Sequence, residues 1–269
     1  MKKLLFLVLF WLSAGQGLAE TYSFGVVPQF EQRKTFAIWK PILDELERRT
    51  GYTFDLVTTP TIPAFEKLYN AGSMDFAYMN PYYMVENPQG YIPLVRDQKP
   101  IIGILVVRKD SPYQSPADLA GKEIAFPSPN AIGASLLPRA DLARQFHISF
   151  VPRYVKSHSS VYLHVAQGIT AAGGGVEKTL EEQPDNIRSS LKVLYTTRAV
   201  PSHPISAHPR VPKKVRDAVQ RALLAMAATP EGKALLDEIP MTQPIATSAK
   251  DYEVMRGFGL EDMFQREAP

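Results

Sequence analysis

The chain has 269 residues, of which 45% are hydrophobic, and its 30 Lys and Arg against 27 Asp and Glu give a formal net charge of +3. Because this charge is small and the basic residues are scattered, the composition does not support nucleic acid binding. There is no cysteine, which excludes disulfides and a lipidated cysteine, so stability must come from a hydrophobic core. The chain is long enough to form such a core and to contain two domains.

The N-terminus has the pattern of a secretory signal peptide. Two lysines precede an apolar run at residues 4–12, and the small residues Gly17 and Ala19 follow it. This pattern predicts cleavage before Glu20 and removal of residues 1–19. An uncleaved anchor is the alternative, which the polar residues and glycines directly after the run disfavour. Export without disulfides indicates a bacterial periplasm as the compartment.

The first part of the mature chain alternates strands and helices. Apolar patterning predicts strands at 22–27, 53–58 and 74–79 and helices at 34–50 and 60–70. Pro41 falls inside the first helical pattern and predicts either a kink or a later helix start. Alternation of this kind predicts right-handed crossovers and a mainly parallel sheet, with ligand sites at the carboxyl ends of its strands.

A second alternating block follows two extended segments at 92–95 and 101–107 and a linker-like stretch at 109–112. Its expected elements are strands at 123–126, 148–155, 170–172 and 191–196 and helices at 132–146, 161–168 and 176–182. The glycines at 173–175 indicate a local break. Two helices, at 212–228 and 230–239, end the pattern, and each begins near a proline.

These elements predict an α/β protein of two lobes with an interdomain cleft. The C-terminal helices have no sheet of their own, so we expect them to pack on the first block and make that lobe discontinuous. The expected division is 20–108 plus 197–269 for lobe 1 and 109–196 for lobe 2, with two crossings between the lobes.

The first of three strand-to-helix junctions contains a cluster of tyrosines. Asn80 is expected to cap a helix that begins at Pro81. Around it, the hydroxyls of Tyr78, Tyr82 or Tyr83 could reach the cleft as hydrogen-bond donors. The alternative is that some of these rings belong to the core and only their hydroxyls meet water.

The second junction, at residues 126–135, leads into a helix through small residues. Asn130, Ala131, Ile132 and Gly133 stand at its start. A helix N-terminus offers unpaired amides and a partial positive charge, so an oxyanion is its natural ligand. As a motif it matches neither a dinucleotide fingerprint nor a phosphate loop, and an ordinary proline-rich turn is the alternative.

The third junction, at residues 156–160, is rich in hydroxyls. Ser157 or Ser159 can cap the following helix, and His158 can donate a hydrogen bond to a ligand. Among the histidines, His158 is favoured because it lies in this helix start. The others fall inside a helix, in a loop, or before prolines where a hinge or return strand is expected: His164, His147, His203 and His208.

Signatures of enzymes are missing from the sequence. There is no cysteine nucleophile, no Gly-x-Ser-x-Gly elbow and no His-Glu-x-x-His metal motif. Acidic residues near the three junctions are sparse, and Asp75, the nearest to the first, is expected to cap or turn the chain. We therefore expect neither an enzyme nor a bound cofactor or metal.

The sequence resembles the phosphate/phosphite/phosphonate-type periplasmic binding proteins of ABC transporters over nearly all of the mature chain. The resemblance is carried by Gly25-Val26-Val27-Pro28, by Asn70 to Ala77 leading to Asn80-Pro81, by Asp118 to Phe126, by Leu136-Leu137-Pro138, by Ser157-His158 with Val165 to Gly168, and by Val200 to Ile205. It implies a type II binding-protein fold, two lobes that close on a ligand, and delivery of that ligand to a membrane permease. It also implies that His158 and a tyrosine of the 78–83 segment hold ligand oxygens.

Two departures from the family pattern concern the ligand. The hydroxyl-rich helix start of the family falls here on Ala131, Ile132 and Gly133, so three side-chain donors are missing. The acid that can meet an aminated ligand is replaced by Ala171. Each missing hydrogen bond to a charged group forfeits ~1.5–3 kcal/mol, so these departures argue against an aminoalkyl phosphonate and favour a less charged or more apolar anion held by backbone amides.

The sequence therefore predicts a monomeric periplasmic solute-binding protein that captures a small, anionic ligand for an ABC-type importer. Its expected partners are the ligand and a membrane permease. The alternative is a ligand-sensing module that controls a membrane signalling protein, which the sequence does not separate from transport.

Overall fold

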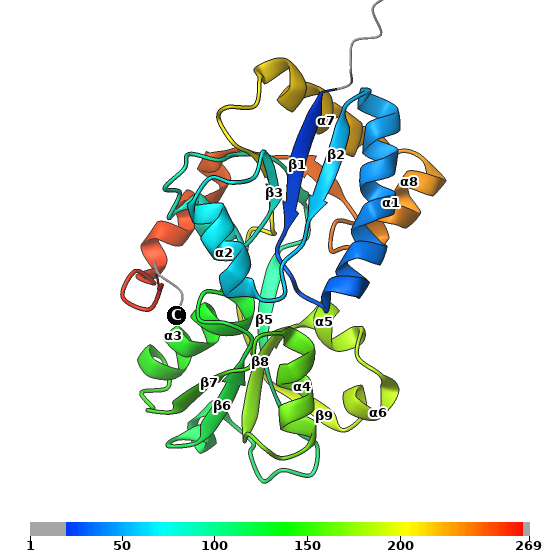
Figure 1. Ribbon diagram of the computed structural model, residues 1–269. Coiled ribbons are helices and arrows are strands. Elements are labelled where there is room, and N and C mark those ends of the chain that lie inside the picture. Colours follow the sequence, from blue (N-terminus) through cyan, green and yellow to red (C-terminus); the bar gives the residue numbers. More distant parts are fainter. Residues whose placement is uncertain (1–19, 266–269) are drawn as a thin grey trace, which may run out of the picture.

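The computed structural model describes residues 20–265. The expected signal peptide at 1–19 and the four residues at the C-terminus lie outside the described residues. Within the described part, none of the helices has the length and apolar character needed to cross a membrane. Two stacked α/β lobes account for the fold, and each contains its own sheet (Figure 1).

The first lobe is built on a six-stranded sheet with the order β11-β4-β10-β3-β1-β2. Its strands are β1 (Thr21–Val26), β2 (Thr53–Val57), β3 (Phe76–Tyr78), β4 (Ile92–Asp97), β10 (Ile205–Ala207) and β11 (Pro244–Ala246). β1 pairs in parallel with β2 and β3, whereas β10 is antiparallel to both β3 and β4. The parallel part confirms the strand–helix alternation expected from the sequence.

Helices on both sides of this sheet complete the first lobe. They are α1 (Gln32–Thr50), α2 (Ile62–Asn70), α7 (Lys213–Met226) and α8 (Pro230–Asp237), with short 3-10 helices η1 (Pro81–Met84) and η4 (Ala249–Phe258). α7 packs on α1 and β4, so the C-terminal helices return to the first lobe. α1 continues through Pro41 and ends at Gly51, whose φ of 74° is the left-handed conformation typical of a helix C-terminus.

The second lobe is built on a five-stranded sheet with the order β7-β6-β8-β5-β9. Its strands are β5 (Ile101–Arg108), β6 (Glu123–Phe126), β7 (Val151–Tyr154), β8 (Ala172–Val176) and β9 (Leu191–Val200). Its helices are η2 (Pro116–Leu119), the π-helix η3 (Ile132–Leu136), α3 (Leu137–Arg144), α4 (His158–Ala166), α5 (Glu177–Glu181) and α6 (Asp185–Arg188).

The lobe boundaries differ from those expected. β5 was placed in lobe 1, but it pairs antiparallel with β8 and β9 in the sheet of lobe 2. The chain therefore crosses between the sheets at residues 98–100 and again at 201–204. An apolar run identifies a strand without identifying its partners. Here one partner of β5 is the strand that contains the glycines at 173–175, which the sequence did not indicate as a strand.

Those glycines form most of β8 instead of a break, because helices press directly on this strand. A Cβ at Gly174 would lie 1.9 Å from the Ala134 carbonyl oxygen, and one at Gly175 would lie 2.0 Å from the Tyr162 hydroxyl. Gly103 of β5 meets the same requirement, since its Cβ would lie 1.9 Å from a carbonyl oxygen of η3. Only glycine allows η3 and α4 to approach the sheet this closely.

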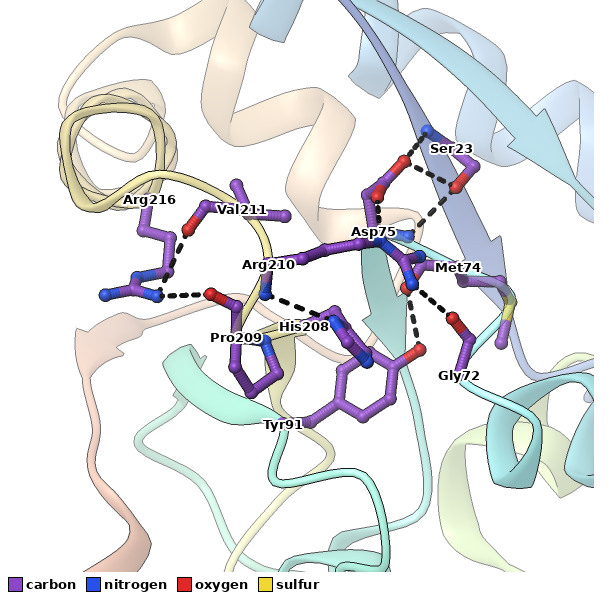
Figure 2. A network of polar contacts seen from close by, with 10 residues as sticks. All are labelled: Ser23, Gly72, Met74, Asp75, Tyr91, His208, Pro209, Arg210, Val211 and Arg216. Atoms are coloured by element: carbon purple, nitrogen blue, oxygen red, sulfur yellow. Dashed lines mark hydrogen bonds and ion pairs between the residues drawn. The ribbon is translucent and has the colours of Figure 1, made fainter.

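Asp75 ties the N-terminal strand to a loop near residue 210 (Figure 2). One carboxylate oxygen accepts hydrogen bonds from Ser23 N at 2.9 Å and Ser23 Oγ at 2.8 Å, and the other accepts one from Arg210 Nε at 2.6 Å. Burial alone would raise the pKa of Asp75, but Arg210 and Ser23 outweigh it and hold this pKa below its ordinary value. Asp75 is therefore a structural residue, lying away from the cavity described below.

We expect Asp75→Asn to lower the free energy of unfolding by about 1–2 kcal/mol at pH 7, because it removes the half-exposed ion pair with Arg210 and the negative charge from the acceptor of the two Ser23 hydrogen bonds. Urea denaturation measures this loss. Since the folded pKa is depressed, the advantage of Asp75 is present above the unfolded pKa of about 4 and is lost as the pH falls through the folded pKa. Asp55→Asn, an exposed position on β2, is the control, and an equal loss there would contradict the assignment.

Candidate functional site

A small cavity lies between the two lobes. Its lining combines residues that follow β1 and β3 in lobe 1 with the starts of η3 and α4 in lobe 2: Val27, Gln29, Ile62, Asn80, Ala131, Ile132, Gly133, Ala134, His158, Val176 and His203. Its volume is about 30 Å³, and since roughly 10–15 Å³ on this scale holds one water, it suits a ligand of few heavy atoms. None of these lining residues is Lys, Arg, Asp or Glu.

Asn80 forms the expected cap and also joins the lobes. Its Oδ1 accepts a hydrogen bond from Tyr82 N at 3.0 Å, which caps η1. Its Nδ2 donates to the Asn130 carbonyl oxygen of lobe 2. Both ends of the amide are therefore used within the protein, and the residue shapes the cavity wall from a fixed position.

The three tyrosines of the first junction do not line the cavity. Tyr78 is buried with its ring 4.8 Å from Trp39 and 5.3 Å from His203, and burial raises its pKa well above the ordinary value. Tyr82 and Tyr83 pack on Phe264 at 5.2 and 5.3 Å. The structure thus favours the alternative in which these rings belong to the core, because each has aromatic neighbours on the lobe 1 side.

Asn130 is a hub of contacts between the lobes and does not line the cavity. Its amide exchanges two hydrogen bonds of 2.8 Å with the backbone of Gln265, and Nδ2 also lies 3.4 Å from the Tyr83 hydroxyl. On the other side of the lobe junction, Lys34 of α1 forms a 2.9 Å ion pair with Glu182. Such an exposed pair contributes little, so the Asn130 cluster is the stronger connection.

Ala131, Ile132 and Gly133 line the cavity at the start of η3. The Ala131 carbonyl oxygen accepts hydrogen bonds from the amides of Ser135 at 2.7 Å and Leu136 at 3.0 Å, so the chain begins with a π turn where an α-helix was expected. Amides in the first turn of a helix have no partner within it. The backbone here can therefore donate to an acceptor in the cavity, although the side chains cannot.

Only the histidine of the third junction reaches the cavity. Of the two serines that the sequence offers as caps, Ser157 caps α4 by accepting a hydrogen bond from Ser160 N at 3.2 Å. Ser159 Oγ accepts a hydrogen bond from Gln183 Nε2 at 3.4 Å. Neither serine lines the cavity, whereas His158, with 4% of its surface exposed, does.

His158 is oriented by a hydroxyl network on its far side. Tyr162 Oη lies 2.8 Å from Thr179 Oγ1, which donates to the Val176 carbonyl oxygen at 2.9 Å. Thr179 Oγ1 also lies 3.3 Å from His158 Nδ1. Tyr162 Oη also donates to the Val176 carbonyl oxygen at 3.0 Å. Where Thr179 takes this acceptor it accepts from His158 Nδ1–H, and where Tyr162 takes it Thr179 can donate to Nδ1. Burial lowers the pKa of His158 to about 4, so at neutral pH the ring is uncharged.

His203 also lines the cavity, and the sequence reasoning missed it. It belongs to the 201–204 crossing and stacks on Tyr78. Burial and, to a smaller extent, the charge of His158 lower its pKa to about 3. The residue was set aside as part of a hinge or return strand. A segment that crosses between the lobes borders the cleft. The expected crossing near residue 200 could therefore have identified His203 as a residue of the site.

The two sheets, the two crossings and the cavity between the lobes define a type II periplasmic binding protein, a class that holds its ligand between two α/β lobes. The model of the ABC transporter phosphonate periplasmic substrate-binding family matches residues 24–252. This chain belongs to that family, whose members are periplasmic substrate-binding proteins that act with membrane permeases and are not enzymes.

Individual relatives agree with the family assignment. The phosphonates-binding periplasmic protein of Escherichia coli K12 is 23% identical over 81% of this chain and 69% of its own length. PhnD1 from Prochlorococcus marinus, solved in complex with methylphosphonate, is similar with a TM-score of 0.81 at 15% identity, covering 89% of this chain and 97% of its own. A phosphonate transporter binding protein from Pseudomonas aeruginosa has a TM-score of 0.77 at 18% identity, covering 89% and 85%.

Proposed function

We propose that this protein captures a small oxyanion of the phosphonate or phosphite kind in the cavity between its lobes and delivers it to the permease of an ABC importer. The observation that carries this proposal is the meeting of the first turn of η3 with His158 in one cavity. Backbone amides and a ring nitrogen can both hydrogen-bond to oxyanion oxygens. The methylphosphonate complex of PhnD1 supports the ligand class.

The size and charge of the cavity narrow the ligand further. Its volume of about 30 Å³ leaves room for few heavy atoms, and no lining carboxylate is available to meet an amine. A ligand with a short or absent alkyl group and no amino group therefore fits best. Methylphosphonate and phosphite meet these conditions, whereas aminoethylphosphonate does not.

A thermal-shift screen tests the ligand class. A ligand that binds the native state raises the melting temperature by mass action. We expect a response to methylphosphonate or phosphite among a set that also contains phosphate, sulfate, carboxylates and amino acids. We expect little or none to aminoethylphosphonate. A large shift by aminoethylphosphonate at micromolar concentration would contradict our interpretation of the lining.

His158→Ala tests the site itself. We expect it to raise the Kd of the ligand that binds best by about 10- to 100-fold, because one hydrogen bond to a charged group contributes about 1.5–3 kcal/mol. Calorimetry measures the change. His147→Asn, at an exposed loop position, is the matched control and should leave the Kd unchanged. Unaltered affinity in His158→Ala would remove His158 from the site.

A further inference from the structure

We propose that the cavity binds its oxyanion together with one proton, which is held by the pair His158 and His203. This inference rests on the proposed function, and it concerns the charge state of the bound ligand. It also assigns His203 as a ligand-binding residue beside His158. The two rings reach the same cavity from different parts of the fold, α4 of lobe 2 and the 201–204 crossing.

The described lining of the cavity offers an anion no permanent positive charge. Among the described residues that line it, none is Lys or Arg, so no permanent cation can meet an anion there. An unpaired charge removed from water costs several kcal/mol. The two histidines are the only lining side chains that can become cationic near neutral pH. The amides of η3 offer only a partial positive charge, so a protonated histidine is the group that can supply a full one.

The hydrogen bonds of His158 carry the second step. In the tautomer in which Nδ1–H donates to Thr179, the neutral ring presents Nε2 without a proton, and no described residue hydrogen-bonds to this atom. In the other tautomer Nε2–H can donate, but the neutral ring carries no charge to balance the anion. An acceptor nitrogen repels an oxyanion oxygen. With a proton on Nε2, the same ring becomes a charged donor that points into the cavity.

His203 limits the pair to one proton. Both rings line the same cavity, and after burial it is His158 that lowers the pKa of His203, so a proton on His158 disfavours a second one on His203. The remaining titratable neighbours are Tyr78, stacked on His203, and Tyr162, which shares Thr179 with His158. Burial raises the pKa of both tyrosines, so they stay neutral. Asp97 acts on Tyr78, while no described acid forms an ion pair with either histidine.

Glu66 also titrates near neutral pH in this region. The test must therefore separate its proton from the proton of the histidine pair. It lies on α2 beside Tyr83 and Asn130 and does not line the cavity. Burial raises its pKa to about 7. A change of affinity with pH could therefore arise from Glu66 unless a variant removes its titration.

Calorimetry in buffers of different ionisation enthalpy counts the protons. The mature chain is titrated at pH 7 with methylphosphonate and with phosphite, and the ionisation of the ligand itself is subtracted. We expect the protein to take up about one proton, with affinity falling up to about tenfold per pH unit as the pH rises through this region. Glu66→Gln should retain the uptake, whereas His203→Gln and His158→Gln should each reduce it and weaken binding.

Three results would overturn the proposal. Binding without proton uptake by the wild-type protein would overturn it and leave the proposed function intact. So would full uptake in a His203→Gln protein whose circular dichroism and melting curve show that it is folded. Failure of every oxyanion to bind the wild-type protein would count against the proposed function and this inference together.

Discussion

Gly174→Ala should be among the most destabilising single substitutions in this protein. The added Cβ would lie 1.9 Å from the Ala134 carbonyl oxygen and 2.7 Å from the Phe126 ring. The first contact is with backbone, so relief requires η3 to move away from the sheet. Overpacking of a core costs about 1–3 kcal/mol and occasionally more, and we expect a loss of free energy of unfolding at or above the upper end of that range.

Urea denaturation measures this loss, and Gly257→Ala is its control. Gly257 lies in η4, and a Cβ there would meet no atom within 4 Å, so its effect should stay within about 0.5 kcal/mol. Because Ala134 also lines the cavity, the Gly174→Ala protein should bind ligand more weakly where it remains folded. A Gly174→Ala protein as stable as the Gly257→Ala protein would show that η3 does not press on β8.

Glu66→Gln should stabilise the protein above neutral pH. Glu66 is buried on α2, with 2% of its surface exposed, and burial raises the pKa of its carboxyl to about 7. The hydroxyl of Tyr83 and the amide of Asn130 oppose this rise only in part. Glutamine has nearly the same shape and never ionises, so the variant avoids a buried charge.

The direction of the pKa shift of Glu66 determines how stability changes with pH. Between the unfolded pKa near 4.5 and the folded pKa near 7, the folded protein binds more protons than the unfolded chain. The stability of the wild type therefore falls as the pH rises through this window. A shift of this size corresponds to about 3 kcal/mol. The variant should match the wild type near pH 4.5 and exceed it by up to about this amount at pH 9.

Chemical denaturation at several pH values tests this expectation, with Glu253→Gln at an exposed position of η4 as the control. The control should follow the pH profile of the wild type. A flat difference between Glu66→Gln and the wild type from pH 5 to 9 would contradict the raised pKa. Because Asn130 connects the lobes beside Glu66, the variant should also keep the lobes together at high pH, which small-angle scattering can measure.

Much of the fold could be predicted because the relevant signals are local. The alternation of apolar segments identified β1, α1, β2, α2 and β3 within a few residues of their observed bounds. Capping by Asn80, and by Ser157 or Ser159, was also expected, because a cap depends on residues two or three positions apart. Two alternating blocks, followed by helices without a sheet of their own, predicted the two lobes, and the family resemblance implied the same architecture.

The site was harder to predict because a cavity is formed by residues distant in sequence. Ala131, Ile132, Gly133 and His158 were expected at the cleft, and they line one cavity. The tyrosines of the 78–83 segment pack against Trp39 and Phe264, which are distant from them in the sequence. His203 reaches the cavity only because the chain crosses between the sheets at this point.

The sequence by itself determined the α/β elements, since hydrophobic periodicity and helix-start chemistry act over a few residues. Its resemblance to a known family added the class of protein. The tertiary structure decided which sheet β5 joins, why β8 consists of glycines, and which side chains meet between the lobes. Strand pairing and close packing join segments far apart in the chain. The tertiary structure also decided the charge of the cavity, because the described residues of its lining include two histidines and no lysine or arginine.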